Sequence, residues 1–209
     1  RTHEDEHTHE GEHTHEGEHT HEHAHAEDHV HDHQHTHHHR SFSDIKRIIE
    51  NSDISDKAKQ LSIAMFERLA QAEGKIHNTP YEEVHFHEVG ALDSILDIVG
   101  TAICIDIIDP DIIISSPVPV GGGMVKCQHG LFPVPAPATL EVLKGVPVYS
   151  KGIQAELVTP TGAVILATLC NEYKGYPSMT IENIGYGLGK NNYEIPNCLR
   201  VCIGKSTKK

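Results

Sequence analysis

Large apolar side chains are almost absent from the first 39 residues, where Val30 is the exception. A segment of this composition cannot bury enough apolar surface to offset the entropy lost on ordering, so we expect disorder. Beyond Ser41 the apolar content is that of an ordinary globular protein, so the low hydrophobic fraction of 37% is a local property. We expect a disordered His/Glu-rich tail over residues 1–40 and one α/β domain over residues 41–209.

Basic residues are scarce too, and the formal net charge is −13. Most of the acidic excess lies in the tail, which leaves the remainder mildly acidic. No basic patch is interleaved with aromatic residues, which argues against a nucleic-acid partner. The sequence has no charged start followed by an apolar signal segment, and no apolar run long enough to cross a bilayer. We therefore expect no membrane partner and a cytoplasmic location.

The five cysteines include no C-x-x-C pair, which argues against a structural zinc knuckle. An odd number of cysteines, most of them inside apolar segments, is typical of reduced thiols rather than disulfides. We expect free and buried thiols. The cysteines are Cys104, Cys127, Cys170, Cys198 and Cys202.

Histidine is abundant in the tail: all but four of the 20 histidines precede residue 40, in H-x-H and HTHE units. Imidazole suits Ni²⁺, Cu²⁺ and Zn²⁺, and the interleaved glutamates attract cations. Engineered tags are usually contiguous histidine runs, so the alternation favours natural metal binding at many weak sites, suited to storage or delivery. The predicted ligands are His21, His23, His25, His29, His31, His33, His35, His37, His38 and His39.

Apolar periodicity predicts helices in the first half of the domain. A short helix starts at Asp44, and a long amphipathic helix follows, with Ser55 as N-cap and Gly74 just past its end. A further turn has Thr79 as its cap. From Val89 to Ile108 the apolar residues surround most of the helix, which predicts central burial.

The second half alternates short strands with helices. The predicted elements are a strand at Ile112–Ile114, a helix from Pro137 to Gly145, a strand at "VPVYS", a strand at "ELV" followed by a turn at Pro160, a helix from Thr161 and two late strands, "MTIENIGYGLG" and "NCLRVCIG". The late strands can pair as a hairpin. This order predicts an α/β fold in which a mixed sheet has flanking helices.

The stretch "HFHEVGALDSILD" combines imidazoles and carboxylates. His85, His87 and Glu88 precede the predicted helix, and Asp93 and Asp97 share one face of it. One interpretation is a metal or cofactor site, because a neighbouring carboxylate orients a ligating imidazole and buried aspartates without a partner are costly. The other is structural: Glu88 caps the helix, the aspartates pair with basic residues, and the histidines lie in a surface loop.

Two further segments are candidates for binding a phosphate. Gly121, Gly122 and Gly123 permit close backbone approach, although the spacing matches no dinucleotide or P-loop pattern. His129 follows, with an ordinary turn as its alternative role. The second segment contains Thr159 and Thr161, which lie at the start of a predicted helix. The exposed backbone amides of a helix start can bind an anion there, and the alternative is that a threonine simply caps the helix.

Several ordered motifs resemble one known family. "HFHEVGALDSILDIVG", "SSPVPVGGGMVKCQHGLFPVPAPAT", "ELVTPTGAVIL" and "GYGLGK" are similar to the N-terminal half of the nickel-insertion protein for the nickel pincer cofactor of lactate racemase. The resemblance runs from about Tyr81 to the C-terminus, and the family also carries a variable His-rich segment. It implies a lyase-class nickel chelatase that inserts Ni²⁺ into pyridinium-3,5-bisthiocarboxylic acid mononucleotide, using CTP with Mn²⁺ or Mg²⁺.

The resemblance also implies an opening segment before the tail and a CTP-associated C-terminal domain after residue 209. We therefore expect this chain to be an incomplete catalyst alone or one product of a split gene. The C-terminal domain is then its expected partner, and assembly into a homo-oligomer is possible as well. Two other functions remain open at this point. One is a nickel or zinc storage protein or metallochaperone without its own catalysis, and the other is an unrelated metalloenzyme using His85, His87 and Glu88.

Overall fold

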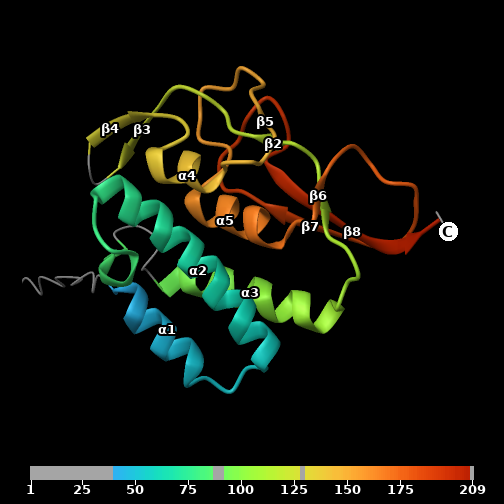
Figure 1. Cartoon of the computed structure of the whole chain (residues 1–209). Coiled ribbons are helices and arrows are strands. Elements are labelled where there is room, and N and C mark those ends of the chain that lie inside the picture. The colour runs from blue at the N-terminus through green and yellow to red at the C-terminus, as the bar shows by residue number, and fades with distance from the viewer. Residues whose placement is uncertain (1–39, 87–91, 128–129, 208–209) are drawn as a thin grey trace, which may run out of the picture. The chain divides into compact units, whose positions relative to one another are not determined.

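The computed structural model describes residues 40–86, 92–127 and 130–207, which Figure 1 shows in colour. They belong to one compact unit of the chain, residues 37–209. The first 39 residues lie outside the described part, so the tail and its boundary near residue 40 stay predictions. Helices and short sheets alternate as expected, and the α/β class is confirmed.

The first helix, α1 (Phe42–Glu50), begins with a reciprocal capping box. The Asp44 N–H donates to the Ser41 hydroxyl oxygen at 3.1 Å, and the Ser41 N–H donates to the Asp44 carboxylate at 3.3 Å. These bonds satisfy two amide groups that an uncapped helix start leaves without partners. The helix predicted from Asp44 is confirmed, and it begins slightly earlier.

The long predicted helix is α2 (Asp56–His77), and its N-cap is Ser55 as expected. Its end was predicted wrongly. Asn78 adopts the left-handed conformation (φ 51°) that ends the helix, and Gly74 lies inside it. A Cβ atom at Gly74 would lie 2.7 Å from the carbonyl oxygen of Thr79, so glycine is needed there for close packing. The prediction that Thr79 caps the following turn was also wrong, since the 3₁₀ helix η1 (Tyr81–Glu83) starts after Pro80 without a side-chain cap. The Thr79 N–H instead donates to the Gly74 carbonyl at the end of α2, at 2.9 Å.

Helix α2 packs against α1, η1 and the three later helices α3 (Leu92–Ile108), α4 (Pro137–Val142) and α5 (Pro160–Leu169). Its Arg68 reaches two of them. Nη1 donates to the carbonyl oxygen of Ala167 at 2.6 Å, and Nη2 donates to that of Val142 at 3.1 Å. Both carbonyls belong to the last turn of a helix, where they lack partners and carry the negative end of the helix dipole.

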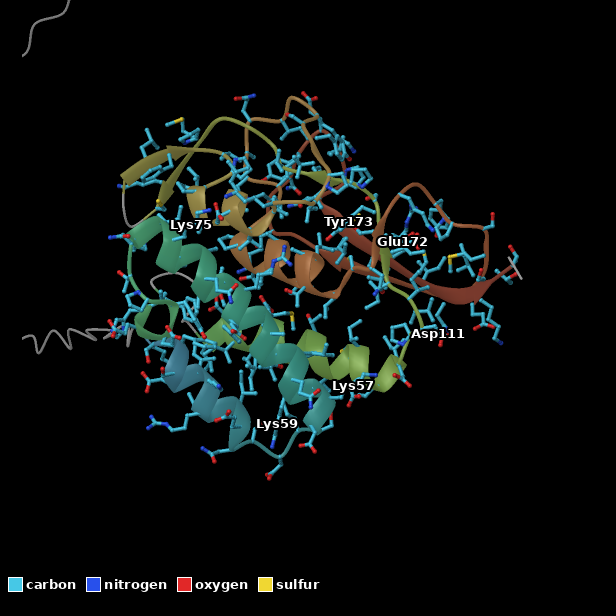
Figure 2. All side chains as sticks on the ribbon, viewed as in Figure 1. Lys57, Lys59, Lys75, Asp111, Glu172 and Tyr173 are labelled. Carbon is cyan, nitrogen blue, oxygen red and sulfur yellow. The ribbon has the colours of Figure 1, made fainter. Side chains whose placement is uncertain are left out.

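Central burial of α3 was predicted wrongly. Ile95, Ile98 and Ala102 are buried, but other apolar side chains of the helix face solvent, among them Ile107 with 77% exposure. The C-terminal end of α3 is held to α2 through an ion pair between Asp109 and Lys57, the latter labelled in Figure 2. Among the described residues no helix has the length and apolarity that a bilayer span requires.

The described strands form four two-stranded sheets, so parallel and antiparallel pairing are both present as predicted. Two pairs are parallel and two antiparallel. The parallel pairs are β1 (Ile114–Ser115) with β6 (Glu172–Tyr173) and β2 (Val118–Pro119) with β5 (Val148–Tyr149). The antiparallel pairs are β3 (Met124–Cys127) with β4 (Gly130–Pro133) and β7 (Met179–Leu188) with β8 (Cys198–Ser206).

Several predicted elements are confirmed with shifted boundaries. The strand expected at Ile112–Ile114 is β1, one or two residues later. The helix expected from Pro137 is α4, which ends at Val142, before Gly145 with its positive φ of 83°. The two late strands pair as a hairpin, as expected. Strands β2, β3, β4 and β6 were not predicted, because short two-to-four-residue strands leave little periodicity to detect. The strand predicted at "ELV" was wrong, since Glu156 forms only an isolated bridge with Gly121 there.

The cysteines are free, as expected, but not buried. Cys104 and Cys198 are exposed, and the remaining three are half-buried. Helix α3 exposes Cys104 because the side of the helix opposite its buried stripe faces solvent. The strand β8 exposes Cys198 because both faces of the β7–β8 hairpin are open to solvent at this end.

The loop after β2 packs tightly against residues 153–156. Gly121 is buried with φ 79°, and a Cβ atom there would lie 1.9 Å from the carbonyl oxygen of Ala155. The Gly122 N–H donates to that same oxygen at 3.2 Å. Glycine is therefore required at position 121 both by its conformation and by the close approach of a second backbone segment.

We predict that Arg68→Met lowers the free energy of unfolding by about 2–3 kcal/mol, because two charge-assisted hydrogen bonds are lost and two helix-end carbonyls lose their donor. Chemical denaturation monitored by circular dichroism measures the change. The matched control is Arg47→Met, whose ion-paired side chain is 73% exposed and whose loss we expect to cost about 0.5 kcal/mol or less. Equal effects of the two substitutions would contradict the role assigned to Arg68.

We predict that Gly121→Ala lowers the free energy of unfolding by roughly 2–3 kcal/mol, because the left-handed conformation disfavours alanine and the methyl group overlaps the Ala155 carbonyl. The control is Gly145→Ala, which has a similar φ of 83° and nothing within 4 Å of the added Cβ. It should show the conformational cost alone, about 1 kcal/mol. Thermal and urea unfolding of both variants measure the difference.

Candidate metal and substrate site

His85 is held at the surface by a short antiparallel pairing. The Phe42 N–H donates to the Val84 carbonyl at 3.1 Å, and the Phe86 N–H donates to the Arg40 carbonyl at 3.1 Å. Val84 and Phe86 are buried while His85 between them is exposed, as alternation along an extended segment requires. The His85 backbone is therefore anchored, and its imidazole is open to a ligand from solvent.

The neighbourhood of His85 is mildly acidic because Asp44 lies close to it. The hydrogen bond from the Ser41 side chain is the main cause that lowers the pKa of Asp44, and the charges of Arg47 and His85 contribute less. Asp44 therefore stays ionised at neutral pH. A carboxylate beside an imidazole favours cation binding there.

Asp93 and Asp97 share one face of α3 as predicted, but that face is exposed and not buried. The Asp93 carboxylate accepts a hydrogen bond from the Ser94 N–H at 2.9 Å. Water hydrates both carboxylates, so neither needs a bound cation for the fold to be stable. The burial expected for Asp93 and Asp97 was therefore wrong, and both carboxylates are accessible to a ligand from solvent.

Several predicted site residues lie outside the described part of the chain. These are His87, Glu88, His129 and the tail histidines. Within residues 40–86, 92–127 and 130–207, no three His, Cys, Asp or Glu side chains gather into a metal-binding group. The metal site built around His85 and His87 therefore stays a prediction.

The glycine loop and the start of α5 have clear structural roles. Gly121 accepts a hydrogen bond from the Ser150 hydroxyl at 3.2 Å, and Gly123 accepts one from the Val134 N–H at 3.0 Å. Thr159 is the N-cap of α5, and its hydroxyl oxygen accepts the Gly162 N–H at 3.2 Å. Thr161 lies half-buried in the first turn of the same helix. Phosphate binding at either segment stays a prediction.

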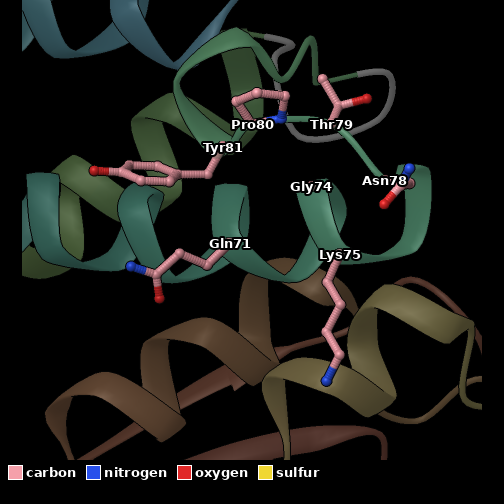
Figure 3. A pocket seen from close by; sticks show the side chains of 7 residues that line it. All are labelled: Gln71, Gly74, Lys75, Asn78, Thr79, Pro80 and Tyr81. Atoms are coloured by element: carbon pink, nitrogen blue, oxygen red, sulfur yellow. The ribbon is translucent and has the colours of Figure 1, made fainter.

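A shallow hollow that the sequence did not reveal lies at the C-terminal end of α2 (Figure 3). Its volume is about 420 Å³. Its side chains supply amide, hydroxyl, phenol and ammonium groups, and the lining contains no carboxylate, imidazole or thiol, so a metal does not fit. The lining residues are Gln71, Gly74, Lys75, Asn78, Thr79, Pro80 and Tyr81.

The one lysine of this hollow is already paired with a carboxylate on α4. The Nζ atom of Lys75 lies 2.7 Å from Glu141, and this hydrogen bond is the main cause that raises the pKa of Lys75. Lys144 lies 2.6 Å from the same carboxylate and is the main cause that lowers the pKa of Glu141. The Lys75 side chain extends from α2 toward α4, as Figure 3 shows, so its charge is directed away from the hollow.

Cys170 and Tyr173 lie together at the end of α5 (Figure 2 labels Tyr173). Burial raises the pKa of the Cys170 thiol, and burial is also the main cause that raises the pKa of Tyr173 to about 12. The Tyr173 hydroxyl donates to the Leu166 carbonyl at 2.8 Å. Both groups are therefore neutral at physiological pH, which disfavours Cys170 as a nucleophile or as a thiolate metal ligand.

Comparison with known proteins yields close relatives. The chain is 53% identical over 169 residues to the pyridinium-3,5-bisthiocarboxylic acid mononucleotide nickel insertion protein of Clostridium kluyveri, covering 81% of this chain and 42% of the relative. It is 52% identical over 170 residues to the protein of the same name from Geobacillus kaustophilus, covering 81% and 41%. No solved structure matches.

The chain therefore spans about two fifths of the length of these relatives. A protein family described as "Nickel insertion protein" matches residues 4–209. This match extends across every described element, from α1 to β8, and confirms the resemblance seen in the sequence motifs. The chain belongs to the nickel insertion protein family.

Proposed function

We propose that this chain takes part in inserting Ni²⁺ into pyridinium-3,5-bisthiocarboxylic acid mononucleotide, which yields the nickel pincer cofactor of lactate racemase. The observation that carries the proposal is the 53% identity over 169 residues to a relative named for this insertion. In the reaction Ni²⁺ gains two bonds to thiocarboxylate sulfurs and one to a ring carbon, and the proton of that carbon is released. A basic group is needed nearby to accept the proton.

The tail is proposed to collect the metal. Imidazole binds Ni²⁺ well, but the thiocarboxylate sulfurs of the substrate are softer ligands, so transfer from tail to substrate is favourable. A segment with many weak sites also releases metal quickly. His21 through His39 would act as a reservoir rather than as one fixed site.

The folded part is proposed to hold the nickel during transfer through His85, His87, Glu88, Asp93 and Asp97. Two observations support this. His85 sits on an anchored backbone with its side chain exposed, beside the ionised Asp44. Asp93 and Asp97 are exposed on one face of α3, where a carboxylate is free to attract a cation or accept a proton. The glycines at 121–123, His129, Thr159 and Thr161 are the proposed phosphate contacts.

The remaining features of the activity follow from the family. We propose a lyase-class reaction that consumes CTP with Mn²⁺ or Mg²⁺, in which the CTP-associated domain is the partner of this chain. A cytoplasmic location and a homo-oligomer also stay predictions.

The second candidate is a nickel or zinc storage protein or metallochaperone. The observation that favours it is the concentration of histidine before residue 40. It differs from the first in assigning no metal site to the folded domain and no contact with the mononucleotide. The following two experiments separate the candidates.

Titration of Ni²⁺ by calorimetry tests the site in the fold. For a version beginning at Arg40, whose carbonyl pairs with Phe86, we expect one saturable site that His85→Ala weakens about tenfold or more, since one strong ligand is lost. The control is His77→Ala, at the end of α2 and 3.5 Å from Glu73, which should leave affinity unchanged. Absence of binding without the tail would support storage instead.

Transfer of nickel tests the insertion. We expect the nickel-loaded chain, mixed with the mononucleotide, CTP and Mg²⁺, and with the C-terminal part of a relative supplied separately, to yield the nickel-bound product faster than free Ni²⁺ at the same concentration. Mass spectrometry of the product measures the transfer, and a chelator added beforehand should abolish it. A rate equal to that of free Ni²⁺ would show that the chain only stores metal.

A further inference from the structure

The β7–β8 hairpin carries two rows of side chains on one face. The register places Tyr186 opposite Arg200 and Ile184 opposite Cys202. Residues directly opposite each other in an antiparallel pair project to the same side, with Cβ atoms about 5 Å apart. Tyr186 and Arg200 are therefore immediate neighbours on this face.

Tyr176, which precedes β7, covers the same face. Its hydroxyl donates to the Cys202 sulfur at 2.8 Å, and the Arg200 guanidinium carbon lies 5.9 Å from the centroid of its ring. The bond to Cys202 is the main cause that raises the pKa of Tyr176, and Tyr186 contributes through its charge. Two phenol rings and one guanidinium thus form a cluster, called here the Tyr–Arg platform (Tyr176, Tyr186 and Arg200).

The Tyr–Arg platform is open to solvent. Tyr176 is 60% exposed and Tyr186 is 63% exposed, although both are large rings in or beside a regular strand. A cation–π contact at the surface stabilises little, about 0.5–1 kcal/mol, so fold stability alone does not account for the arrangement. Exposed aromatic rings on a strand, interleaved with arginine, are how sheets stack planar rings of nucleotides.

The chemistry of the platform fits a pyridinium mononucleotide. The ring is cationic and electron-poor, and a tyrosine face is negative, so the two attract when stacked. The thiocarboxylate and phosphate groups are anions, and a guanidinium pairs with such groups through two parallel hydrogen bonds. The exposed faces of the tyrosines and the adjacent arginine therefore complement both parts of this molecule.

We propose that the Tyr–Arg platform binds the pyridinium mononucleotide, with its ring stacked on Tyr186 and Tyr176 and a thiocarboxylate group of that ring paired with Arg200. This assignment rests on the proposed function, since the ligand is the substrate named there. A competing occupant of the same face is a second copy of the chain, because Ile184 and Leu188 are also exposed beside the platform. The experiment distinguishes the two.

Nicotinic acid mononucleotide serves as the probe, because it is a pyridinium mononucleotide with a carboxylate on the ring. Calorimetry with the full chain should show binding, and ribose 5-phosphate, which lacks the ring, should bind at least tenfold more weakly. Tyr186→Ala should weaken probe binding about 5- to 100-fold, the range for losing one stacking contact. Tyr186→Phe keeps the ring and should retain affinity within about threefold.

The matched control is Tyr149→Ala. Tyr149 is also exposed and has a cation over its ring, since Lys151 lies 5.7 Å from the centroid, but it belongs to β5. Its loss should leave probe affinity unchanged. Absence of probe binding, equal binding of ribose 5-phosphate, or equal effects of Tyr186→Ala and Tyr149→Ala would each overturn the proposal. So would a dimer in sedimentation velocity that Tyr186→Ala dissociates.

The nickel-transfer assay separates this proposal from the proposed function. If the Tyr186→Ala variant transfers nickel with an unchanged KM for the mononucleotide, the binding role proposed for the platform is wrong, while the proposed insertion function is retained. If the unaltered chain binds the probe as described but transfers no nickel above the free-metal rate, insertion fails while the platform stands as a mononucleotide site. A raised KM for the mononucleotide with a retained kcat in the Tyr186→Ala variant supports both the insertion function and the binding role of the platform.

Discussion

The contact on which the described fold depends most is that of Arg68 with the carbonyl ends of α4 and α5. Helix α2 lies against every other helix, and apolar packing alone would let those helices slide along it. A guanidinium has planar donors in fixed directions, so the Arg68 side chain fixes the positions of the C-terminal ends of α4 and α5 against α2. The buried Phe66–Phe86 contact, with ring centroids 6.0 Å apart, then ties the His85 segment to the same helix.

The proposed chemistry is spread over the surface of this framework. His85 is exposed because its neighbours Val84 and Phe86 anchor the chain in the core, and the aspartates of α3 are exposed because the opposite side of that helix is buried. Ligands presented in this way suit a protein that receives a metal and passes it on. A buried and fully coordinated site would hold the metal more tightly but would release it slowly.

Much of the secondary structure could be predicted because it depends on local patterns. The caps at Ser41, Ser55 and Thr159 and the apolar stripe of α2 all follow from residues within one or two turns of each other. The end of α2 was missed because Gly74 suits a helix end by its own preference. It lies inside the helix only because the chain at Thr79 returns against it, which is a contact between separate segments.

The sequence by itself determined the family and the order of the helices, since these depend on motifs and short-range periodicity. Only the tertiary structure decided which polar residues are buried. The apolar pattern of α3 has no clear polar face, so nothing local indicated that Asp93 and Asp97 face solvent. Nor could the motif "GYGLGK" reveal that Tyr186 lies beside Tyr176 and Arg200, because strand pairing brings them together.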